Sequence, residues 1–179
     1  MKEKLFISAF AFLLTSCLLS SCYSSSQIKV YAYTQPVITG VSPNTAIDEK
    51  GKKVESPRKN RANQYFYFEF KPGKNPTPVA IWFKDKAWKV TTQPVSETPI
   101  EIMDQQVPGK SAKTILVPAS GNEVVSLSLD FSNPVPFTPN TKLKNLLADS
   151  DVVFEYTYKG KTYYKALKKI TQLNPVATQ

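Results

Sequence analysis

The chain has 179 residues and no histidine, and its 23 lysines and arginines against 14 acidic residues give a formal net charge of +9. It carries 14 prolines but only 6 glycines, and both of its cysteines, Cys17 and Cys22, lie near the N-terminus. This length is typical of a single domain. The absence of histidine removes the commonest general base and metal ligand, and the cysteine positions exclude a disulfide framework or a cysteine nucleophile from the rest of the chain. We therefore expect no catalytic residue, no metal and no cofactor.

The first 21 residues have the layout of a secretory signal peptide. Lys2 and Lys4 form a basic start, and the ten residues Leu5–Leu14 contain Ser8 as their only polar side chain. Ten apolar residues are too few to cross a membrane, because a spanning helix needs about 20. A basic start, a short apolar stretch and small residues after it are typical of a segment that is removed on export.

A lipid-attachment motif follows this segment. Leu19–Cys22 (LSSC) resembles the lipobox of bacterial lipoproteins, in which a leucine and two small residues precede a cysteine. The resemblance implies that Cys22 is lipidated, becomes the first mature residue and anchors the chain without a transmembrane helix. Leu14–Cys17 (LTSC) fits the motif more loosely and is the rival site. We prefer Cys22, since cleavage there leaves residues 22–27 as a polar tether; the alternative is an ordinary signal peptide with incidental cysteines.

The export signal changes which partners the positive charge favours. Removing residues 1–21 takes away two lysines and one glutamate, so the net charge becomes +8. Outside the cytoplasm we expect no nucleic-acid partner, and the counter-charge is an anionic lipid, an acidic glycan or an envelope protein. Tyr23, rather than aspartate, follows the cysteine, and no acidic cluster comes after it. By the lipoprotein resemblance, both features favour the outer membrane facing the periplasm, or the outer cell face of a bacterium with one membrane.

The body of the chain alternates apolar and polar residues with period two, which is typical of half-buried β-strands. We therefore predict an all-β fold, an immunoglobulin-like antiparallel β-sandwich over residues 28–170, followed by a flexible tail at 171–179. Only residues 141–148 have the apolar spacing of a short helix. The predicted strands are Ile28–Tyr33, Val37–Val41, Tyr65–Phe70, Val79–Phe83, Ala87–Thr92, Ile100–Met103, Thr114–Val117, Val125–Phe131, Val152–Tyr158 and Thr162–Ala166.

The last hairpin has two sequence-compatible registers. A two-residue loop at Lys159–Gly160 places Lys165 across from Phe154, whereas a three-residue loop pairs Phe154 with Tyr164. We prefer the second register because it buries one apolar face, leaves Lys165 outside and gives Gly160 a left-handed position.

Two further segments stay open. Around Lys84–Lys86, either Phe83 or Trp82 pairs with Trp88, and we expect one tryptophan in the core and the other partly exposed. Residues 44–64 hold six basic and three acidic residues without strand periodicity, so we expect a mobile loop.

Motifs for catalysis are weak. Ser56–Lys59 matches the S-x-x-K pattern of penicillin-binding enzymes, but it contains Pro57, lies in a basic loop and lacks the partner motifs, so we interpret it as a chance match. Asp149 and Asp151 flank Ser150, and we expect them to shape the turn before the next strand. A pair of carboxylates of the glycosidase type needs only spatial proximity, and no particular pair stands out.

The aromatic residues give the remaining chemical signal. One group of tyrosines falls on the polar side of the predicted strands, beside lysines. It forms a candidate ligand face for sugar rings, peptides or anionic groups. The alternative is that cross-strand tyrosine pairs stabilise a solvated sheet face, and this second interpretation carries more weight. The candidate face comprises Tyr31, Tyr33, Tyr65, Tyr67, Tyr163 and Lys165.

The sequence thus predicts a lipid-anchored, non-enzymatic binding or assembly module of the bacterial envelope. Its partner is a protein, a glycan or a lipid. The alternative is a carboxylate-dependent hydrolase of envelope glycans.

Overall fold

The computed structural model describes residues 27–39, 45–47, 53–55, 61–83, 86–107, 110–136 and 138–178. The expected signal peptide, Cys22 and residues 23–26 lie outside this part of the chain. The described elements are β1 (Ile28–Thr39), β2 (Thr45–Ile47), β3 (Lys53–Glu55), β4 (Arg61–Phe70), β5 (Thr77–Phe83), β6 (Lys86–Pro94), β7 (Ile100–Val107), β8 (Lys110–Val117), β9 (Glu123–Val135), α2 (Thr141–Ala148), β10 (Val152–Tyr158), β11 (Lys161–Leu167), β12 (Thr171–Gln172) and β13 (Val176–Thr178). The predictions of an all-β fold and of a short helix at 141–148 are confirmed.

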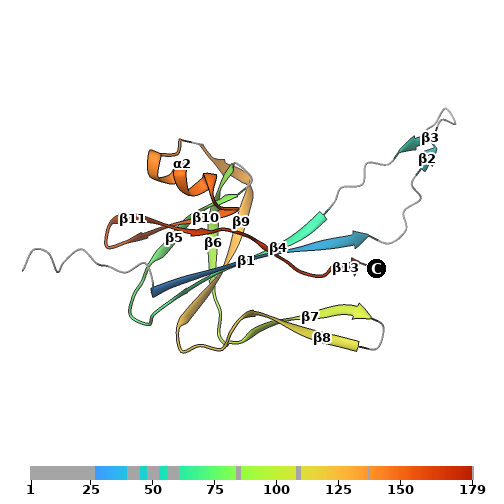
Figure 1. Cartoon of the computed structure of the whole chain (residues 1–179), viewed down its shortest axis with the longest axis horizontal. Coiled ribbons are helices and arrows are strands. Elements are labelled where there is room, and N and C mark those ends of the chain that lie inside the picture. The colour runs from blue at the N-terminus through green and yellow to red at the C-terminus, as the bar shows by residue number, and fades with distance from the viewer. Residues whose placement is uncertain are drawn as a thin grey trace, which may run out of the picture.

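Most strands belong to one curled, mixed sheet (Figure 1). Its order is β11-β10-β5-β6-β9-β4-β1, and β12 and β13 both pair with the remaining edge of β1. All neighbours along this path are antiparallel except β12 and β13, which run parallel to β1. The curl brings β11 close to β1, so the inner face of the sheet encloses a core.

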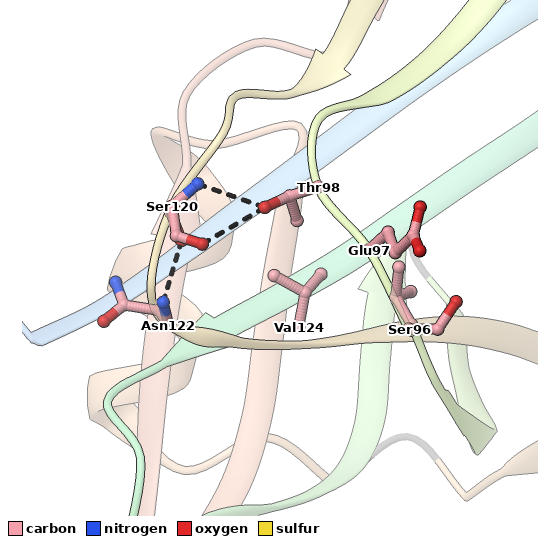
Figure 2. Close-up of a pocket in the computed structure, with 7 residues that line it drawn as sticks. Ser96, Glu97, Thr98, Ser120, Asn122 and Val124 are labelled. Carbon is pink, nitrogen blue, oxygen red and sulfur yellow. Dashed lines mark hydrogen bonds between the residues drawn. The ribbon is translucent and has the colours of Figure 1, made fainter.

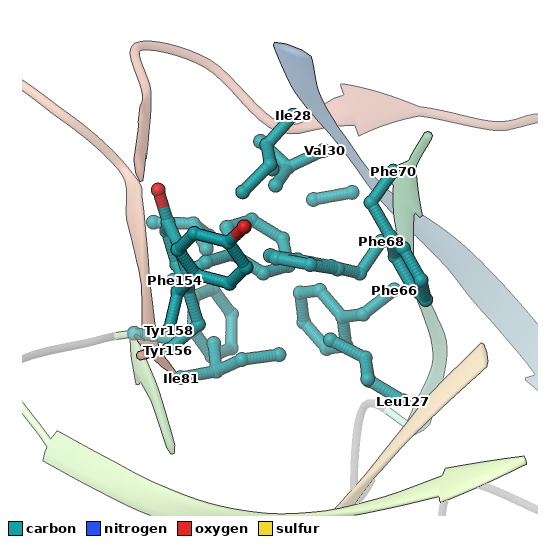
Figure 3. Close-up of a cluster of buried hydrophobic side chains, with 13 residues drawn as sticks. Ile28, Val30, Phe66, Phe68, Phe70, Ile81, Leu127, Phe154, Tyr156 and Tyr158 are labelled. Carbon is teal, nitrogen blue, oxygen red and sulfur yellow. The ribbon is translucent and has the colours of Figure 1, made fainter. Parts of the chain in front are cut away.

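The inner core is built by the alternation in β4 and its neighbours (Figure 3). Phe66, Phe68 and Phe70 point inward, as their period-two spacing predicts. Phe68 is fully buried, with its ring centroid 5.3 Å from that of Tyr156, and the Phe66 and Phe154 centroids lie 6.2 Å apart. Edge-to-face aromatic pairs therefore join β4 to β10 across the core.

Helix α2 covers part of the outer face of the sheet. Asn140 caps it, since the side-chain oxygen accepts a hydrogen bond from the Leu143 backbone N–H at 2.9 Å. Leu143 is buried against Trp82, Ala87 and Val153. Strands β5 and β10 consequently bury side chains on both faces, inward into the core and outward against the helix.

The register preferred for the last hairpin is wrong. The structure pairs Phe154 with Lys165 across a two-residue turn, and Lys159 and Gly160 have φ values of 48° and 71°. Two consecutive residues with positive φ define the type I′ turn, whose twist matches that of paired strands. A shift of one residue moves every side chain of a strand to the other face. Tyr164 therefore packs toward α2. The residue pattern of the hairpin did not reveal that a helix covers this face of the sheet.

The other hairpin register also differs from both expected alternatives. Ile81 pairs with Trp88 and Trp82 pairs with Ala87. The expectation of one buried and one partly exposed tryptophan is confirmed, because Trp82 lies in the core and Trp88 is half-buried.

Two strand boundaries need correction. Ile28–Tyr33 and Val37–Val41 were expected as separate strands, yet β1 runs through Pro36 to Thr39. The missing N–H of proline is tolerated there because Pro36 lies between the segments of β1 that pair with β12 and β13. Residues 171–178, expected as a flexible tail, add these two strands, and Leu173 is buried against the outer face.

The expected loop 44–64 also contains paired backbone. Strands β2 and β3 form a separate antiparallel pair, and β4 already begins at Arg61. The other residues of this segment, including Ser56–Lys59, lie outside the described ones. In the part of the chain that the structure describes, no helix has the length and apolar character that a membrane span requires.

Substituting Phe68→Ala should lower the free energy of unfolding by about 3–5 kcal/mol, because it empties a fully buried aromatic site. Val79→Ala is the control: this side chain is 39% exposed, and its loss should cost less than about 0.5 kcal/mol. Chemical denaturation of both variants measures the difference. Equal effects at the two positions would contradict the described core.

Candidate functional site

Four of the predicted face residues share the outer face of β1 and β4. Tyr31 pairs with Tyr67 and Tyr33 with Tyr65, directly across the two strands. The β7–β8 hairpin packs against them, and together they form an outer cluster of buried and half-buried side chains. Tyr67 is only 9% exposed. The four tyrosines thus lie together as predicted, but largely beneath the hairpin.

The hydroxyl groups of Tyr31, Tyr33 and Tyr65 bond within the protein. Tyr33 donates to the Leu116 carbonyl oxygen in β8, and Tyr65 donates to the Gln35 side-chain oxygen at 3.0 Å. Burial raises the pKa of Tyr33 and, together with the neighbouring Tyr65 and Tyr33, that of Tyr67. These contacts favour the interpretation that the tyrosine pairs stabilise the fold.

The centre of the polar contacts on this face is Glu69. Its side chain is fully buried, and three donors surround its carboxylate. Oε1 accepts hydrogen bonds from Lys29 Nζ at 3.1 Å and from Asn122 Nδ2 at 2.5 Å, and Oε2 accepts one from the Tyr31 hydroxyl at 2.5 Å. The carboxylate of Glu69 in β4 is therefore joined to β1 and to the turn that precedes β9.

The surrounding donors decide the charge state of Glu69. Burial alone raises its pKa, but the hydrogen bonds from Tyr31, Asn122 and Lys29, with the positive charge of Lys29, outweigh burial and lower it. Burial and the same hydrogen bond raise the pKa of Tyr31, which stays a donor. Glu69 is thus held as a carboxylate whose lone pairs are engaged.

The remaining two residues of the predicted face lie elsewhere. Tyr163 and Lys165 belong to β11 and point to the inner side of the sheet, because the two-residue turn sets their register. Tyr163 stacks on Tyr156, with ring centroids 5.6 Å apart and planes inclined by 18°. The structure therefore does not bring these two residues to the four outer tyrosines.

A shallow polar pocket adjoins Glu69 (Figure 2). It lies between the chain entering β7 and the chain entering β9, and its volume is about 310 Å³. Thr98 and Ser120 hold its walls together, since the Thr98 hydroxyl accepts from the Ser120 N–H and donates to the Ser120 carbonyl, both at 3.1 Å. The lining residues are Val95, Ser96, Glu97, Thr98, Ser120, Asn122 and Val124. Glu97 is the only carboxylate among them.

An aromatic pair of one exposed and one half-buried ring lies on β6 and β9, away from this pocket. The rings of Trp88 and Phe131 meet edge to face with centroids 5.2 Å apart, and Lys86 Nζ lies 5.9 Å from the Trp88 ring centroid. Phe131 is 59% exposed, although the alternation in Val125–Phe131 predicts an inward position. The β6–β9 register shifts between Trp88 and Val90, so residues 130–133 form a bulge. Such bulges redirect side chains, and here the bulge carries Phe131 into solvent.

The acidic residues after the helix have structural contacts. Asp149 ends α2, and Asp151 Oδ2 accepts the Ile170 N–H at 3.0 Å, which shapes the turn before β10. Within the described ranges, no three His, Cys, Asp or Glu side chains lie close enough together to hold a metal ion.

Sequence reasoning missed the central roles of Glu69, Asn122 and the Trp88–Phe131 pair. A lone acidic residue between phenylalanines in YFYFEF was a usable signal for Glu69, since it interrupts an aromatic run. Asn122 and Phe131 carried no such signal, because a loop conformation and a bulge place them.

Substituting Glu69→Gln should lower the free energy of unfolding at neutral pH by about 1.5–3 kcal/mol, because it removes charge-assisted hydrogen bonds. The lowered pKa of Glu69 stabilises the native state above the ordinary value of 4.5, and this contribution is lost as pH falls from there through the native pKa. The variant should lack that part of the pH dependence, which denaturation at a series of pH values measures.

Glu97→Gln, at an exposed carboxylate, is the matched control and should keep the wild-type pH profile. A Glu69→Gln profile that coincides with the wild-type profile between pH 4.5 and the acid limit of folding would refute this role of Glu69.

A scan against protein-family models gave no match, and searches of curated proteins and of solved structures gave none either.

Proposed function

We propose that this chain is a lipid-anchored protein of the bacterial envelope that binds a protein, glycan or lipid partner without catalysing a reaction. The LSSC motif ending at Cys22 supports the anchor. By the same resemblance, the domain faces the periplasm from the outer membrane. A short tether then joins the anchor to a folded domain whose described residues begin at Gln27.

The observation that supports the binding function is the Trp88–Phe131 pair, in which Phe131 is exposed and Trp88 half-buried. Phe131 leaves most of its surface in water, whereas its apolar neighbours in β9 pack into the inner core. Aromatic side chains contribute large contact areas at recognition sites, and tryptophan leads the residues that dominate binding energy. Lys86, beside the Trp88 ring, adds a positive charge suited to an anionic partner.

The hydrolase alternative has less support from the geometry. A glycosidase needs two carboxyl groups about 5–9.5 Å apart on either side of the scissile bond. The pocket offers Glu97 alone, and the neighbouring Glu69 is buried with its oxygens engaged by Lys29, Tyr31 and Asn122. Glu97 is thus positioned for a ligand, whereas Glu69 stabilises the fold.

The finer fold that we propose is an immunoglobulin-like β-sandwich. Strands β4 and β10 face each other across the inner core, as the two inner faces of a sandwich do, and this supports the proposal. The continuous pairing from β5 through β6 and β9 to β4 would then be the closed side of the sandwich.

Cys22→Ser should abolish the incorporation of labelled fatty acid in cells and release the protein from the membrane fraction, because it removes the acylated thiol. Cys17→Ser is the matched control and should leave labelling unchanged. Label that survives both substitutions would overturn the lipid anchor, and label lost only with Cys17→Ser would move it to the rival site.

A photo-crosslinking side chain in place of Phe131 should give a defined adduct in intact cells, because this position lies on the proposed contact surface. The same side chain in place of Val79, exposed on β5, is the control and should give no such adduct. Adding Trp88→Ala should reduce the Phe131 adduct several-fold by removing the neighbouring ring. Identical adducts at both positions would contradict binding at the aromatic pair.

A further inference from the structure

Two connecting segments lie at the end of the domain where β1 begins. Ile28 pairs with Phe70, so the loop 71–76 follows directly beside the start of β1. Thr157 pairs with Thr77, which places the β10–β11 turn, residues 158–161, next to the same loop. Figure 1 shows the start of β1, this loop and this turn together at the left of the molecule. We call the two segments the anchor end.

The anchor end is basic. Its sequences, KPGKNP and YKGK, contain four lysines and no acidic residue. Lys71, Lys159 and Lys161 are exposed, and Lys74 is half-buried. Glu123, at the start of β9, contacts this end, where its Oε1 accepts the Gly73 N–H at 3.4 Å.

Local geometry holds these lysines in place. Gly73 has a φ of 73°, and the Lys74 N–H bonds the Lys71 carbonyl at 3.1 Å, which closes the loop. The type I′ turn fixes Lys159, whose Nζ lies 5.5 Å from the centroid of the Tyr158 ring. The positive charges therefore sit on short, defined connections rather than on a long loop.

The proposed tether places the same end near a membrane. Six residues lead from Cys22 to Ile28, and six residues of fully extended chain span at most about 22 Å. An anchor at Cys22 thus holds the start of β1 within this distance of the lipid surface. Tethering at such short range raises the effective concentration of the neighbouring lysines at the headgroups.

We propose that the anchor end rests on anionic phospholipid headgroups of the leaflet that holds the lipid anchor, through Lys71, Lys74, Lys159 and Lys161. This inference rests on the proposed lipidation of Cys22. Clustered basic residues next to a membrane attachment are drawn to anionic lipid, and the attraction falls off within a Debye length. The contact fixes the orientation of the domain, with the anchor end against the membrane.

The test uses the lipidated protein, purified in detergent and reconstituted into vesicles of phosphatidylcholine alone or mixed with phosphatidylglycerol. An amine-reactive reagent labels accessible lysines, and mass spectrometry reads the rate at each position. The anchor-end lysines should react several-fold more slowly on the anionic vesicles, and high salt should restore their rates. Lys142 and Lys144 on α2 and Lys168 after β11, all exposed, should react equally on both vesicles.

Two matched variants then separate local charge from total charge. Lys71→Gln, Lys159→Asn and Lys161→Gln together should abolish the slowing at Lys74; asparagine is chosen at position 159 because it tolerates the positive φ. Lys142→Gln, Lys144→Gln and Lys168→Gln together remove the same charge and should leave the slowing at Lys74 intact.

Flotation of the vesicles distinguishes the two proposals. Protein that does not float with the vesicles refutes the anchor and this inference together. Protein that floats but shows equal lysine rates on both lipids refutes only the orientation by the anchor end. Slowing by a soluble acidic glycan on neutral vesicles would assign these lysines to a glycan and also overturn the inference.

Discussion

The pairing of β1 with β4 from Ile28 to Val37 is the constraint on which the inner core and the outer tyrosine cluster depend. Because side chains alternate along a strand, this one ladder sends phenylalanines inward and tyrosines outward at the same time. The inner side chains meet β5, β9 and β10 in the curled sheet, and the outer ones receive the β7–β8 hairpin. A slip of one residue would exchange the two faces and disrupt both.

Glu69 makes the outer face polar at one end without leaving a buried group unpaired. A fully buried carboxylate is unfavourable by itself, since its hydration is lost. Tyr31, Asn122 and Lys29 replace that hydration, and they come from two separate parts of the chain, β1 and the turn before β9. The same contacts position Asn122 at the wall of the polar pocket. Stability and the shape of the pocket are thus coupled through one side chain.

The arrangement divides the domain between structure and recognition. Tyrosines that looked like a ligand face from the sequence pack against the hairpin, and the Tyr33 hydroxyl bonds to Leu116 of that hairpin. The proposed partner site lies instead at the bulge in β9, where Phe131 meets Trp88. The proposed membrane contact lies at the anchor end, where β1 begins. A lipid-anchored module of this form would present its partner site away from the tether.

The sequence by itself determined the strand class, the helix at 141–148 and the proposed export and anchoring signals, because each depends on short-range patterns. Period-two alternation, apolar residues at helical spacing and a cysteine after small residues are visible within a few positions. Only the tertiary structure decided which faces are covered. Tyr163 turned inward because a two-residue turn set its register, Phe131 turned outward because of a bulge, and residues 171–178 joined the sheet because the edge of β1 was open to parallel pairing. Each of these outcomes depends on contacts between segments far apart in the chain, which local patterns do not encode.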